Sequence, residues 1–413
     1  MTAPAAAAPR VYWLTEEFFP PERGGTGVIA SRLAQGLAKR GVSIQVITRQ
    51  TLPPSLEREV VGNVGIRRIP PPGRLKGVGW RALPAMFSYM LRITFLLITE
   101  WRQYDVVMVS GMKIIPIAAV PICRLLRKPC VVRVESPFEI VEPISSESLG
   151  MMNKARGRIL AGALKMFQRR AITRAHCVVA ISDDIANLLK RFEPPLSRIL
   201  NIPNAADLEL YEPIPGDERE QLRKRLGFPV GSTIALYVGR LSRAKGLMML
   251  LEAWRTVTAT HPSALLVMVG SGKGSWDDCE GEIVEYVRGH DLKAHVTLTG
   301  QSDRVHEYLQ AADVFVSPSD YEGFSLTLVE ALGCAIPVVT TAVGAAPQII
   351  RDGVSGFLCP PKDVEALRAA IELALQRRTS WSSIGRLGRE AVAAFDIPNV
   401  VERYMELLRQ LHG

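Results

Sequence analysis

The stretch "RVYWLTEEFFPPERGGTGVIASRLAQGLAKRGVSIQVIT" (residues 10–48) carries the pattern on which the fold depends. It runs from the apolar segment "RVYWL" through the helical pattern "GVIASRLAQGLAKRG" to the apolar segment "VSIQVIT". Similar runs follow, separated by helix-length segments: "YDVVMVS", "PCVVRVE" and "AHCVVAIS". Short apolar strands between helices indicate a parallel α/β sheet covered on both faces. "EVVGNVGIRRI" predicts a hairpin that turns at Gly62 and Asn63.

A second series of apolar runs follows an interruption rich in prolines and acids, "LNIPNAADLELYEPIPGDE" (200–218). The later runs are "TIALYVG", "ALLVMVG", "HVTLTG", "DVFVSPS" and "IPVVTT". We therefore expect an α/β protein of two doubly wound Rossmann-like domains facing each other across a cleft, at residues 1–205 and 206–395. An amphipathic C-terminal helix (396–413) is expected to pack back toward the first domain. Ligands of such folds bind beyond the carboxyl ends of the strands.

Length and composition agree with this expectation. A chain of 413 residues is too long for one ordinary core, and its 47% apolar and 22% charged residues are typical of a globular protein. The six cysteines are scattered without CxxC spacing, which argues against a disulfide framework or a zinc site and favours a reducing compartment. The opening "MTAPAAAAPR" lacks the features of a signal peptide, so we expect a cytoplasmic protein.

The net charge of +9 is distributed unevenly. Residues 1–205 hold 29 Lys and Arg and 14 Asp and Glu, a balance of +15. Residues 206–413 hold 21 Lys and Arg and 27 Asp and Glu, a balance of −6. A basic half suggests an anionic partner, either nucleic acid or a membrane surface, and a solvated face without a partner is the alternative. Nucleic acid is not expected, because interleaved aromatic residues and a recognisable binding module are missing.

Two carboxylates flank a Gly-Phe-Ser turn in "PSDYEGFSLTLVEALGCAIPVV" (318–339). Such a pair can serve as acid and base, bind a metal, or hydrogen-bond a polyhydroxylated ligand. Ser325 is a candidate N-cap for a helix that starts near Leu326, and the amides around it are expected to point into the cleft beside Glu322. Glu330 lies on the next turn of that helix. The alternative for Glu322 is a simple turn residue, and the alternative for Glu330 is a glutamate on the helix surface.

Two further segments suit a phosphate ligand. In "YVGRLSRAKG" (237–246), Gly239 permits a sharp turn, and Arg240 and Lys245 then stand at the carboxyl end of a strand. Two cations there can bind a diphosphate and neutralise a leaving group, although solvated surface cations are the simpler interpretation. "PERGGTG" (21–27) precedes a helix, whose free amides favour an anion. A flexible turn is the alternative, and the spacing does not match a dinucleotide fingerprint.

Together these motifs resemble the retaining glycosyltransferases of family 4, which have the two-Rossmann-domain GT-B fold and include enzymes of bacterial cell-surface saccharides. "EGFSLTLVE" matches the E-x7-E signature, and "VGRLSRAKG" matches the diphosphate motif. "PERGGTG", "IPNAAD", "AADVFVSPS" and "RDGVSGFLCP" occur in the order found in the family. The resemblance covers nearly the whole chain and implies an acceptor-binding first domain and a nucleotide-sugar-binding second domain.

The resemblance also implies roles for individual residues. Glu330 would bind ribose hydroxyls and Glu322 the transferred sugar, while Arg240 and Lys245 would hold the diphosphate. The two acids are thus expected to anchor ligand rather than act as an acid/base pair. Arg240, Lys245 and Glu322 form the expected catalytic group. The expected donor-binding residues are Gly24, Gly25, Thr26, Gly239, Gly323, Phe324, Ser325, Leu326 and Glu330.

One departure from the family pattern concerns the sugar, and a separate observation concerns the metal. Relatives often carry a histidine after the strand "VVRV", where this chain has Glu135 and Ser136, which we take as the candidate acceptor or sugar pocket. A D-x-D metal motif is missing, so we expect no metal and no cofactor. The expected donor is a UDP- or GDP-sugar of the hexose type.

Two segments bear on the membrane. Residues 85–99, "AMFSYMLRITFLLIT", are shorter than a membrane span and predict a buried helix of the first domain. In residues 154–174, helical spacing places Lys154, Arg158, Lys165 and Arg169 on one face and an apolar stripe opposite. We expect the stripe to be buried and the cations to face anionic lipid. The alternative is a helix that simply packs on the sheet.

The sequence therefore predicts a metal-independent retaining glycosyltransferase. It would extend a saccharide acceptor, lipid-linked in our preferred interpretation, in cell-envelope polysaccharide or glycolipid synthesis at the cytoplasmic face of the plasma membrane. The alternatives are transfer to a soluble acceptor, a nucleotide-sugar isomerase (epimerase) of the same fold, and a non-catalytic binder that uses the cleft for regulation.

Overall fold

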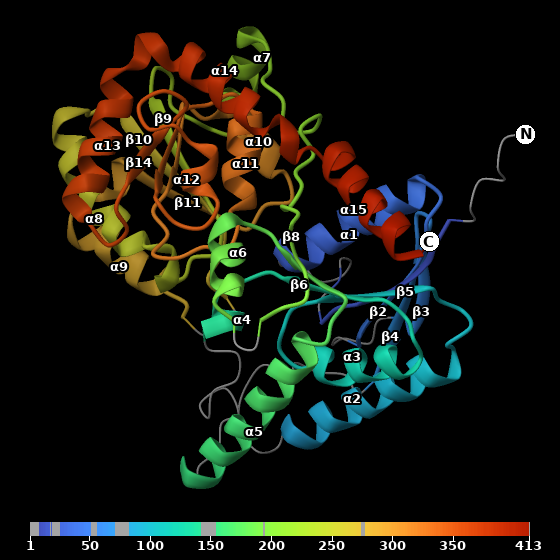
Figure 1. The fold of residues 1–413 in the computed structure, drawn as a ribbon. Coiled ribbons are helices and arrows are strands. Elements are labelled where there is room, and N and C mark those ends of the chain that lie inside the picture. Colours follow the sequence, from blue (N-terminus) through green and yellow to red (C-terminus); the bar gives the residue numbers. More distant parts are fainter. Residues whose placement is uncertain are drawn as a thin grey trace, which may run out of the picture. The chain divides into compact units, whose positions relative to one another are not determined.

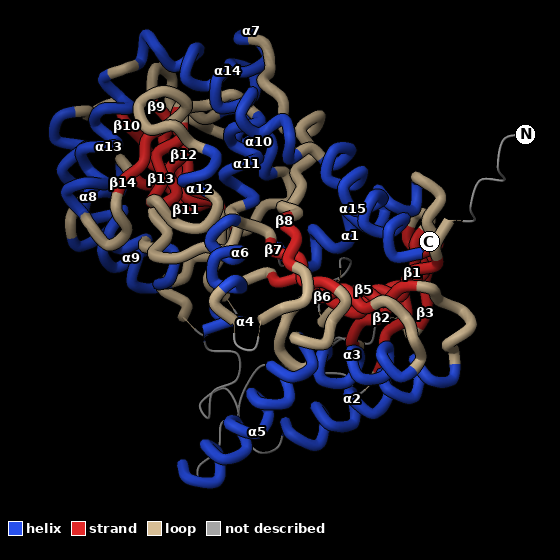
Figure 2. Tube along the Cα trace, viewed as in Figure 1, coloured by secondary structure: helices blue, strands red, loops and turns tan. Residues whose placement is uncertain are grey.

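The computed structural model describes residues 8–16, 18, 25–50, 56–70, 82–141, 154–192, 195–273 and 277–412. The chain divides into two compact α/β units. Unit 1 comprises Met1–Ala205 together with Ile397–Gly413, and unit 2 comprises Ala206–Asp396. Figures 1 and 2 show a sheet flanked by helices in each unit.

The described part of unit 1 contains an eight-stranded sheet in the order β3-β4-β2-β1-β5-β6-β7-β8. All its pairings are parallel except that of β3 with β4, which forms the hairpin predicted at Gly62 and Asn63. The strands are β1 (Arg10–Leu14), β2 (Ser43–Arg49), β3 (Arg58–Val61), β4 (Val64–Ile69), β5 (Val106–Ser110), β6 (Cys130–Val134), β7 (Cys177–Ala180) and β8 (Ile199–Asn201).

Helices cover both faces of this sheet (Figure 1). One layer contains α2 (Ala82–Thr99), α3 (Ile115–Leu125) and α5 (Lys154–Ile172), with α3 in contact with both others. The other layer contains α1 (Gly25–Lys39) and the C-terminal α15 (Ile397–His412). These two helices approach closely at Gly36, where a Cβ atom would lie 2.5 Å from Val401 Cγ2. The short α4 (Phe138–Val141) and α6 (Asp183–Lys190) follow β6 and β7.

Unit 2 has a six-stranded parallel sheet in the order β11-β10-β9-β12-β13-β14. Its strands are β9 (Thr233–Val238), β10 (Ala264–Val269), β11 (Val296–Gly300), β12 (Val314–Ser317), β13 (Val338–Thr341) and β14 (Phe357–Cys359). Its α-helices are α7 (Gly216–Arg225), α8 (Leu247–Thr260), α9 (Glu280–Gly289), α10 (Val305–Ala311), α11 (Leu326–Gly333), α12 (Ala346–Ile349), α13 (Val364–Gln376) and α14 (Trp381–Val392). Every side chain of β9 and β10 is buried, because helices cover both faces.

The two doubly wound parallel sheets confirm the predicted fold class. Each apolar run named above forms a strand, although β8 and β14, at three residues each, were not predicted. A run of three residues is too short to carry a period-2 pattern. Helix α15 belongs to unit 1 by its contacts, which include those with α1.

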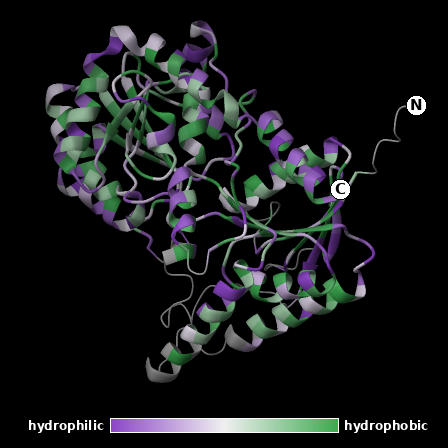
Figure 3. Cartoon of the chain, in the orientation of Figure 1, coloured by the Kyte–Doolittle hydropathy of each residue, from purple (hydrophilic) through white to green (hydrophobic). Residues whose placement is uncertain are grey.

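The prediction for residues 85–99 is wrong in part. One face of α2 is buried through Tyr89, Ile93 and Leu97, but Leu91 and Phe95 on the opposite face are 69% and 70% exposed. Apolar residues run along this helix in Figure 3. The helix is therefore apolar on both sides, and only one of them packs on the protein.

The prediction for residues 154–174 also needs correction. Leu164 and Ala171 are buried as expected, but Ile159 and Phe167 are 74% and 51% exposed. Lys165 is partly buried instead of projecting outward. Arg169 is likewise partly buried, and the side chains of Lys154 and Arg158 lie outside the described residues. The proposed cationic membrane face is therefore not present at Lys165 and Arg169.

A hydrogen bond accounts for this rotation of α5. Gln168 is buried and its Nε2 donates to the backbone oxygen of Met112 at 2.6 Å. This contact turns the Gln168 side of the helix inward, together with Ala161, Leu164 and Ala171. Lys165 is next to Gln168 and is drawn inward with it, while Phe167 is left outside.

Candidate functional site

The loop after β9 is held against the loop after β12. It contains a short 3-10 turn, Arg243–Lys245, that ends at Gly246 with φ +64°. A Cβ atom at Gly246 would lie 2.0 Å from the Pro318 oxygen, so both the conformation and the close approach require glycine. The Asp320 amide donates to the Ala244 oxygen at 3.1 Å, which joins the two loops.

This junction brings Lys245 and Glu322 together. Lys245 Nζ donates to Glu322 Oε1 in an ion pair of two partly buried side chains. Ser319 Oγ donates to the same oxygen at 3.3 Å. The lysine and the acid, 77 positions apart in the chain, thus form one polar cluster at the carboxyl ends of two neighbouring strands, β9 and β12.

A second cation stands in the same loop. The backbone oxygen of Arg240 accepts a hydrogen bond of 2.8 Å from the hydroxyl of Tyr237, whose pKa is raised first by burial and then by the negative charge of Glu322. The Arg240 side chain is exposed, and no carboxylate within the described ranges pairs with it. Its guanidinium is therefore open to an anionic ligand, as is expected of Arg240 from the sequence.

The turn before α11 confirms the predicted cap. Ser325 Oγ accepts from the Leu328 amide at 3.3 Å, and the helix begins at Leu326. Gly323 and Phe324 are buried. Gly344 packs closely against the backbone of this turn, and a Cβ atom at Gly344 would lie 2.8 Å from the backbone oxygen of Glu322. The turn is thus fixed by packing on two sides.

Glu330 is buried within α11, at 5% exposure. A helix-surface glutamate is therefore ruled out. A carboxylate buried in this way is unfavourable unless it is hydrogen-bonded or paired. Burial, followed by the charge of Glu330, raises the pKa of the neighbouring Cys334 thiol. Gly239, Lys245, Glu322 and Glu330 are all held in unit 2.

The remaining predicted residues belong to unit 1. Helix α1 begins at Gly25, so Gly25 and Thr26 occupy its first turn, while Gly24 lies outside the described residues. The free amides of this turn and the positive end of the helix favour an anion.

Glu135 follows β6 and is held by a buried arginine. Arg133, almost fully buried, donates to Glu135 Oε1 through one terminal nitrogen and to Asn204 Oδ1 through the other. Ser136 follows it, and the Ser136 oxygen accepts from the Glu139 amide at 3.0 Å. Glu135 is therefore anchored, as a residue of a preorganised pocket needs to be.

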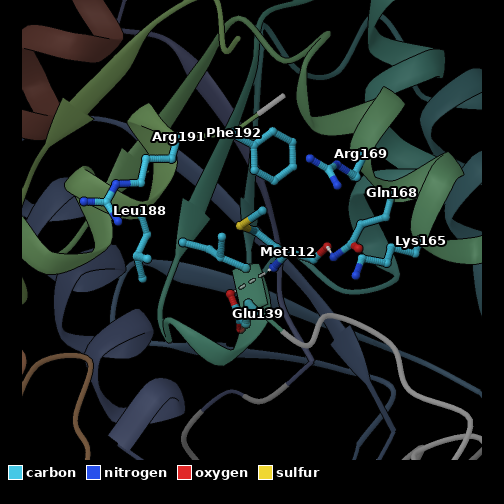
Figure 4. A pocket seen from close by; sticks show the side chains of 9 residues that line it. Met112, Glu139, Lys165, Gln168, Arg169, Leu188, Arg191 and Phe192 are labelled. Carbon is cyan, nitrogen blue, oxygen red and sulfur yellow. Dashed lines mark hydrogen bonds between the residues drawn. The ribbon is translucent and has the colours of Figure 1, made fainter. Parts of the chain in front are cut away.

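Sequence reasoning missed Glu139. Its Oε2 accepts from the Met112 amide at 3.1 Å (Figure 4) and from the Glu135 amide at 3.3 Å. Burial and then the charge of Glu135 raise the pKa of Glu139 to about 8. The sequence does contain a signal for it: Glu139 lies four residues after Glu135, and the proline between them favours a turn that brings the chain back to the end of the strand.

Metal-binding side chains do not gather in the described part of the chain: no group of three or more His, Cys, Asp or Glu is placed to hold an ion. All six cysteines are buried and free. No helix among the described residues is long and apolar enough to cross a membrane.

Two protein-family models match the chain. Residues 24–205 match the model of the glycosyl transferase 4-like domain, and residues 218–391 match that of glycosyl transferases group 1. The D-inositol 3-phosphate glycosyltransferase of Geodermatophilus obscurus is 28% identical over 88% of this chain and 80% of its own. The teichuronic acid biosynthesis glycosyltransferase TuaC of Bacillus subtilis, a putative assignment in its own name, is 28% identical over 88% of each chain.

Solved structures agree on the fold. Sucrose-phosphate synthase of Thermosynechococcus elongatus superposes with a TM-score of 0.79 at 24% identity, over 98% of this chain and 99% of its own. HepE of Anabaena, solved in complex with UDP, superposes with a TM-score of 0.75 at 18% identity, over 97% of this chain and 100% of its own. The protein is thus a glycosyltransferase with the GT-B fold. It belongs to glycosyltransferase family 4, with both characteristic domains present.

Proposed function

We propose that this enzyme moves a hexose-type sugar from a nucleotide diphosphate sugar to a saccharide acceptor with retention of configuration. The observation that carries the proposal is the Lys245–Glu322 ion pair beside the open guanidinium of Arg240. Two cations match the charge of a diphosphate, and the carboxylate can accept hydrogen bonds from sugar hydroxyls. Glu330, one turn into α11, is assigned to the ribose. UDP and UDP-glucose bind to the related HepE fold, which favours a UDP-sugar over a GDP-sugar.

In the proposed reaction the acceptor attacks from the face that the nucleotide leaves. The bond between the sugar C1 and the phosphate oxygen breaks, the bond to the acceptor oxygen forms, and the acceptor proton passes to the leaving phosphate. Arg240 and Lys245 stabilise the negative charge that develops on that phosphate. Because these side chains supply positive charge, we propose that no metal or other cofactor is needed.

The arrangement also implies an exchange of partners. Lys245 is paired with Glu322 in the structure. A donor diphosphate would compete for Lys245 and leave Glu322 available to the hydroxyls of the transferred sugar. One ligand would thus satisfy both members of the pair.

Donor binding can be measured by calorimetric titration with UDP and GDP in excess EDTA. We expect one of the two to bind in EDTA, and Lys245→Ala to weaken that binding at least about tenfold, because a charge-assisted contact is lost. Arg243→Ala is the matched control, since Arg243 lies in the same loop but is exposed and pairs with Glu282. Binding that appears only after Mg²⁺ is added contradicts metal independence.

For the acceptor, we propose a lipid-linked saccharide of the cell envelope, reached at the cytoplasmic membrane surface. The supporting feature is the α2 row, defined as the exposed residues Phe87, Leu91, Phe95 and Ile98. The exposed Arg92 and Arg102 flank the row. An apolar row with neighbouring arginines suits the interface of an anionic membrane, where apolar burial and charge attraction act together. The α2 row replaces the cationic face predicted on α5.

Vesicle co-sedimentation tests this surface. We expect wild-type protein to bind vesicles that contain anionic lipid and to bind less as salt rises, since the Debye length is only about 8 Å at physiological ionic strength. Leu91→Asp with Phe95→Asp should abolish binding, whereas Val230→Asp, at a 93% exposed position of unit 2, should not. Equal binding by the double variant and wild type contradicts the proposal and favours a soluble acceptor.

A further inference from the structure

Helix α11 carries part of the predicted donor site. Glu322 lies in the turn before the helix, Glu330 lies within it, and the helix ends at Gly333 after only eight residues. Every residue of α11 from Leu328 onward is buried. A shift or rotation of this short helix would move Glu330 together with the donor turn, defined as residues 322–325. The geometry of the site therefore depends on the contacts that hold α11 in place.

The C-terminal end of α11 is held by one arginine of α14. Arg389 donates through Nη1 to the backbone oxygen of Gly333 and, at 3.0 Å, to that of Tyr211. Its Nη2 donates to the backbone oxygen of Leu208 at 3.3 Å. A cation is favourable at the last carbonyls of a helix, because these carbonyls lack partners within the helix and form the negative end of its dipole. Arg389 thus joins α11 to residues 206–211, the segment that begins unit 2.

Backbone atoms also meet closely at this end of α11. A Cβ atom at Gly333 would lie 2.8 Å from the Tyr211 oxygen, and a Cβ atom at Gly385 of α14 would lie 1.8 Å from the Ala335 oxygen. These contacts leave α11 no space to move toward either neighbour, since backbone atoms cannot turn aside as a flexible side chain can. The hydrogen bonds of Arg389 oppose movement in the other direction.

The donor turn is held by the residues that follow α14. A 3-10 turn, Ala393–Phe395, places the ring of Phe395 edge-on to that of Phe324, with 5.7 Å between the ring centres and 65° between the ring planes. This is a preferred geometry of aromatic pairs. The Phe395 oxygen accepts from the Ala206 amide at 2.9 Å. Both ends of α11 are therefore fixed by α14 or by the turn after it, and both fixings involve residues 206–211.

The charge of Arg389 also acts on the surroundings of Glu330. The pKa of the Cys334 thiol, which follows α11, is raised by burial and by the negative charge of Glu330 and is lowered by the positive charge of Arg389. The two charges thus act on the same group with opposite sign. Because a buried carboxylate is unfavourable without compensation, a nearby guanidinium lowers the free-energy cost of burying Glu330.

We infer that Arg389 is a positioning residue of the donor site, which fixes the position of α11 along its axis so that Glu330 meets the ribose. Phe395 has the corresponding role for the donor turn, through Phe324. These roles rest on the proposed function, because they take a nucleotide as the ligand of Glu330. They add to it that side chains without ligand contact set the affinity for the donor.

Calorimetric titration of the full-length protein with UDP, or with GDP where wild-type protein prefers it, tests the role of Arg389. We expect Arg389→Ala to weaken nucleotide binding about tenfold, within the range of coupling between groups in contact, with the number of sites unchanged. A purely structural role would lower the melting temperature and the number of sites, and would leave the dissociation constant of the folded molecules unchanged.

Arg386→Ala is the matched control and should bind the nucleotide as wild type does, because Arg386 lies on the same helix, is exposed and pairs with Glu390. Arg389→Lys keeps the charge but loses the planar fork of donors, so we expect an affinity between those of wild type and Arg389→Ala. If Arg389→Ala does not fold, Arg389→Lys and Phe395→Leu carry the same comparison.

Double-mutant cycles separate positioning from a general loss of the site. In a Glu330→Gln background, Arg389→Ala should weaken binding by less than about twofold, because its effect passes through Glu330. In a Lys245→Ala background the two losses should multiply, because Lys245 belongs to the separate loop after β9. Losses that multiply in the Glu330→Gln background contradict the positioning role.

Phe395 is tested against a second aromatic pair of unit 2. Phe395→Ala should weaken nucleotide binding, whereas Phe228→Ala should not, because Phe228 packs on Tyr308 with 6.4 Å between ring centres and neither belongs to the predicted site. Wild-type affinity in the Arg389 and Phe395 variants, with weakened binding in Lys245→Ala, overturns the positioning roles alone. Wild-type protein that binds neither nucleotide, or Lys245→Ala with wild-type affinity, contradicts the proposed function as well.

Discussion

Lys245→Ala and Arg240→Ala are each expected to lower kcat about 10²–10³-fold, the usual effect of removing a preorganised charge contact to a transition state. The leaving diphosphate gains negative charge as the C1–O bond breaks, and the two cations of the β9 loop are placed to meet it. Folding should be affected little. Arg240 is exposed, and Lys245 contributes a partly buried pair to a loop already held by Gly246 and the Asp320 amide.

Single-turnover kinetics and thermal unfolding together check this prediction. Arg243→Ala should retain wild-type turnover, because Arg243 is exposed, points to Glu282 and lies three residues from Arg240. Near-wild-type turnover in either Lys245→Ala or Arg240→Ala refutes the assignment of the diphosphate site. Equal losses in all three variants would show a general effect of loop charge and would also contradict it.

Glu330→Gln is expected to lower kcat/KM for the donor about 10–100-fold, because hydrogen bonds to a charged group are worth roughly 1.5–3 kcal/mol. The substitution keeps the volume of the buried side chain and removes its charge. The loss should appear in KM if Glu330 binds the ribose equally in the ground state and the transition state.

Glu252→Gln, at an exposed position of α8, is the control and should leave both constants unchanged. Melting temperatures of both variants show whether either change acts through folding. Wild-type donor affinity in a well-folded Glu330→Gln variant would mean that the buried acid has a structural role only.

The sheets could be predicted from sequence because their strands are buried on both faces. Five consecutive apolar residues in β9 and six in β10, with helices between them, predict strands that are buried on both faces. The cap at Ser325 was equally accessible, since a serine before an apolar helix is a local signal. The cap also predicted that Glu322 lies in the loop before the helix and that Glu330 lies within the helix.

The orientation of helices could not be predicted in the same way. Helical spacing shows which residues share a face of α5, but both faces contain apolar residues, so the inward face is decided by a tertiary contact. That contact is the hydrogen bond from Gln168 to Met112, 56 residues earlier in the chain. Hydropathy alone favoured Phe167 for the interior, and the structure places it outside.

Charged residues inside the first sheet were also beyond sequence reasoning. Arg133 stands within the run "CVVRV" and is almost fully buried, which depends on Glu135 and on the distant Asn204. Glu139 was overlooked for the same reason, because its partners are the backbone amides of two separate segments. Pairing across the fold, rather than local pattern, positions these groups.

Transfer of a sugar from a nucleotide diphosphate donor is tested by a donor panel. The protein is incubated with each common nucleotide sugar and membrane lipid extract in excess EDTA, and release of nucleoside diphosphate is measured. We predict release from one donor class, most strongly a UDP-hexose, with loss of the signal in Lys245→Ala and its retention in Arg243→Ala. Release from no donor, or conversion of the donor to an isomeric nucleotide sugar without release, would contradict the assignment.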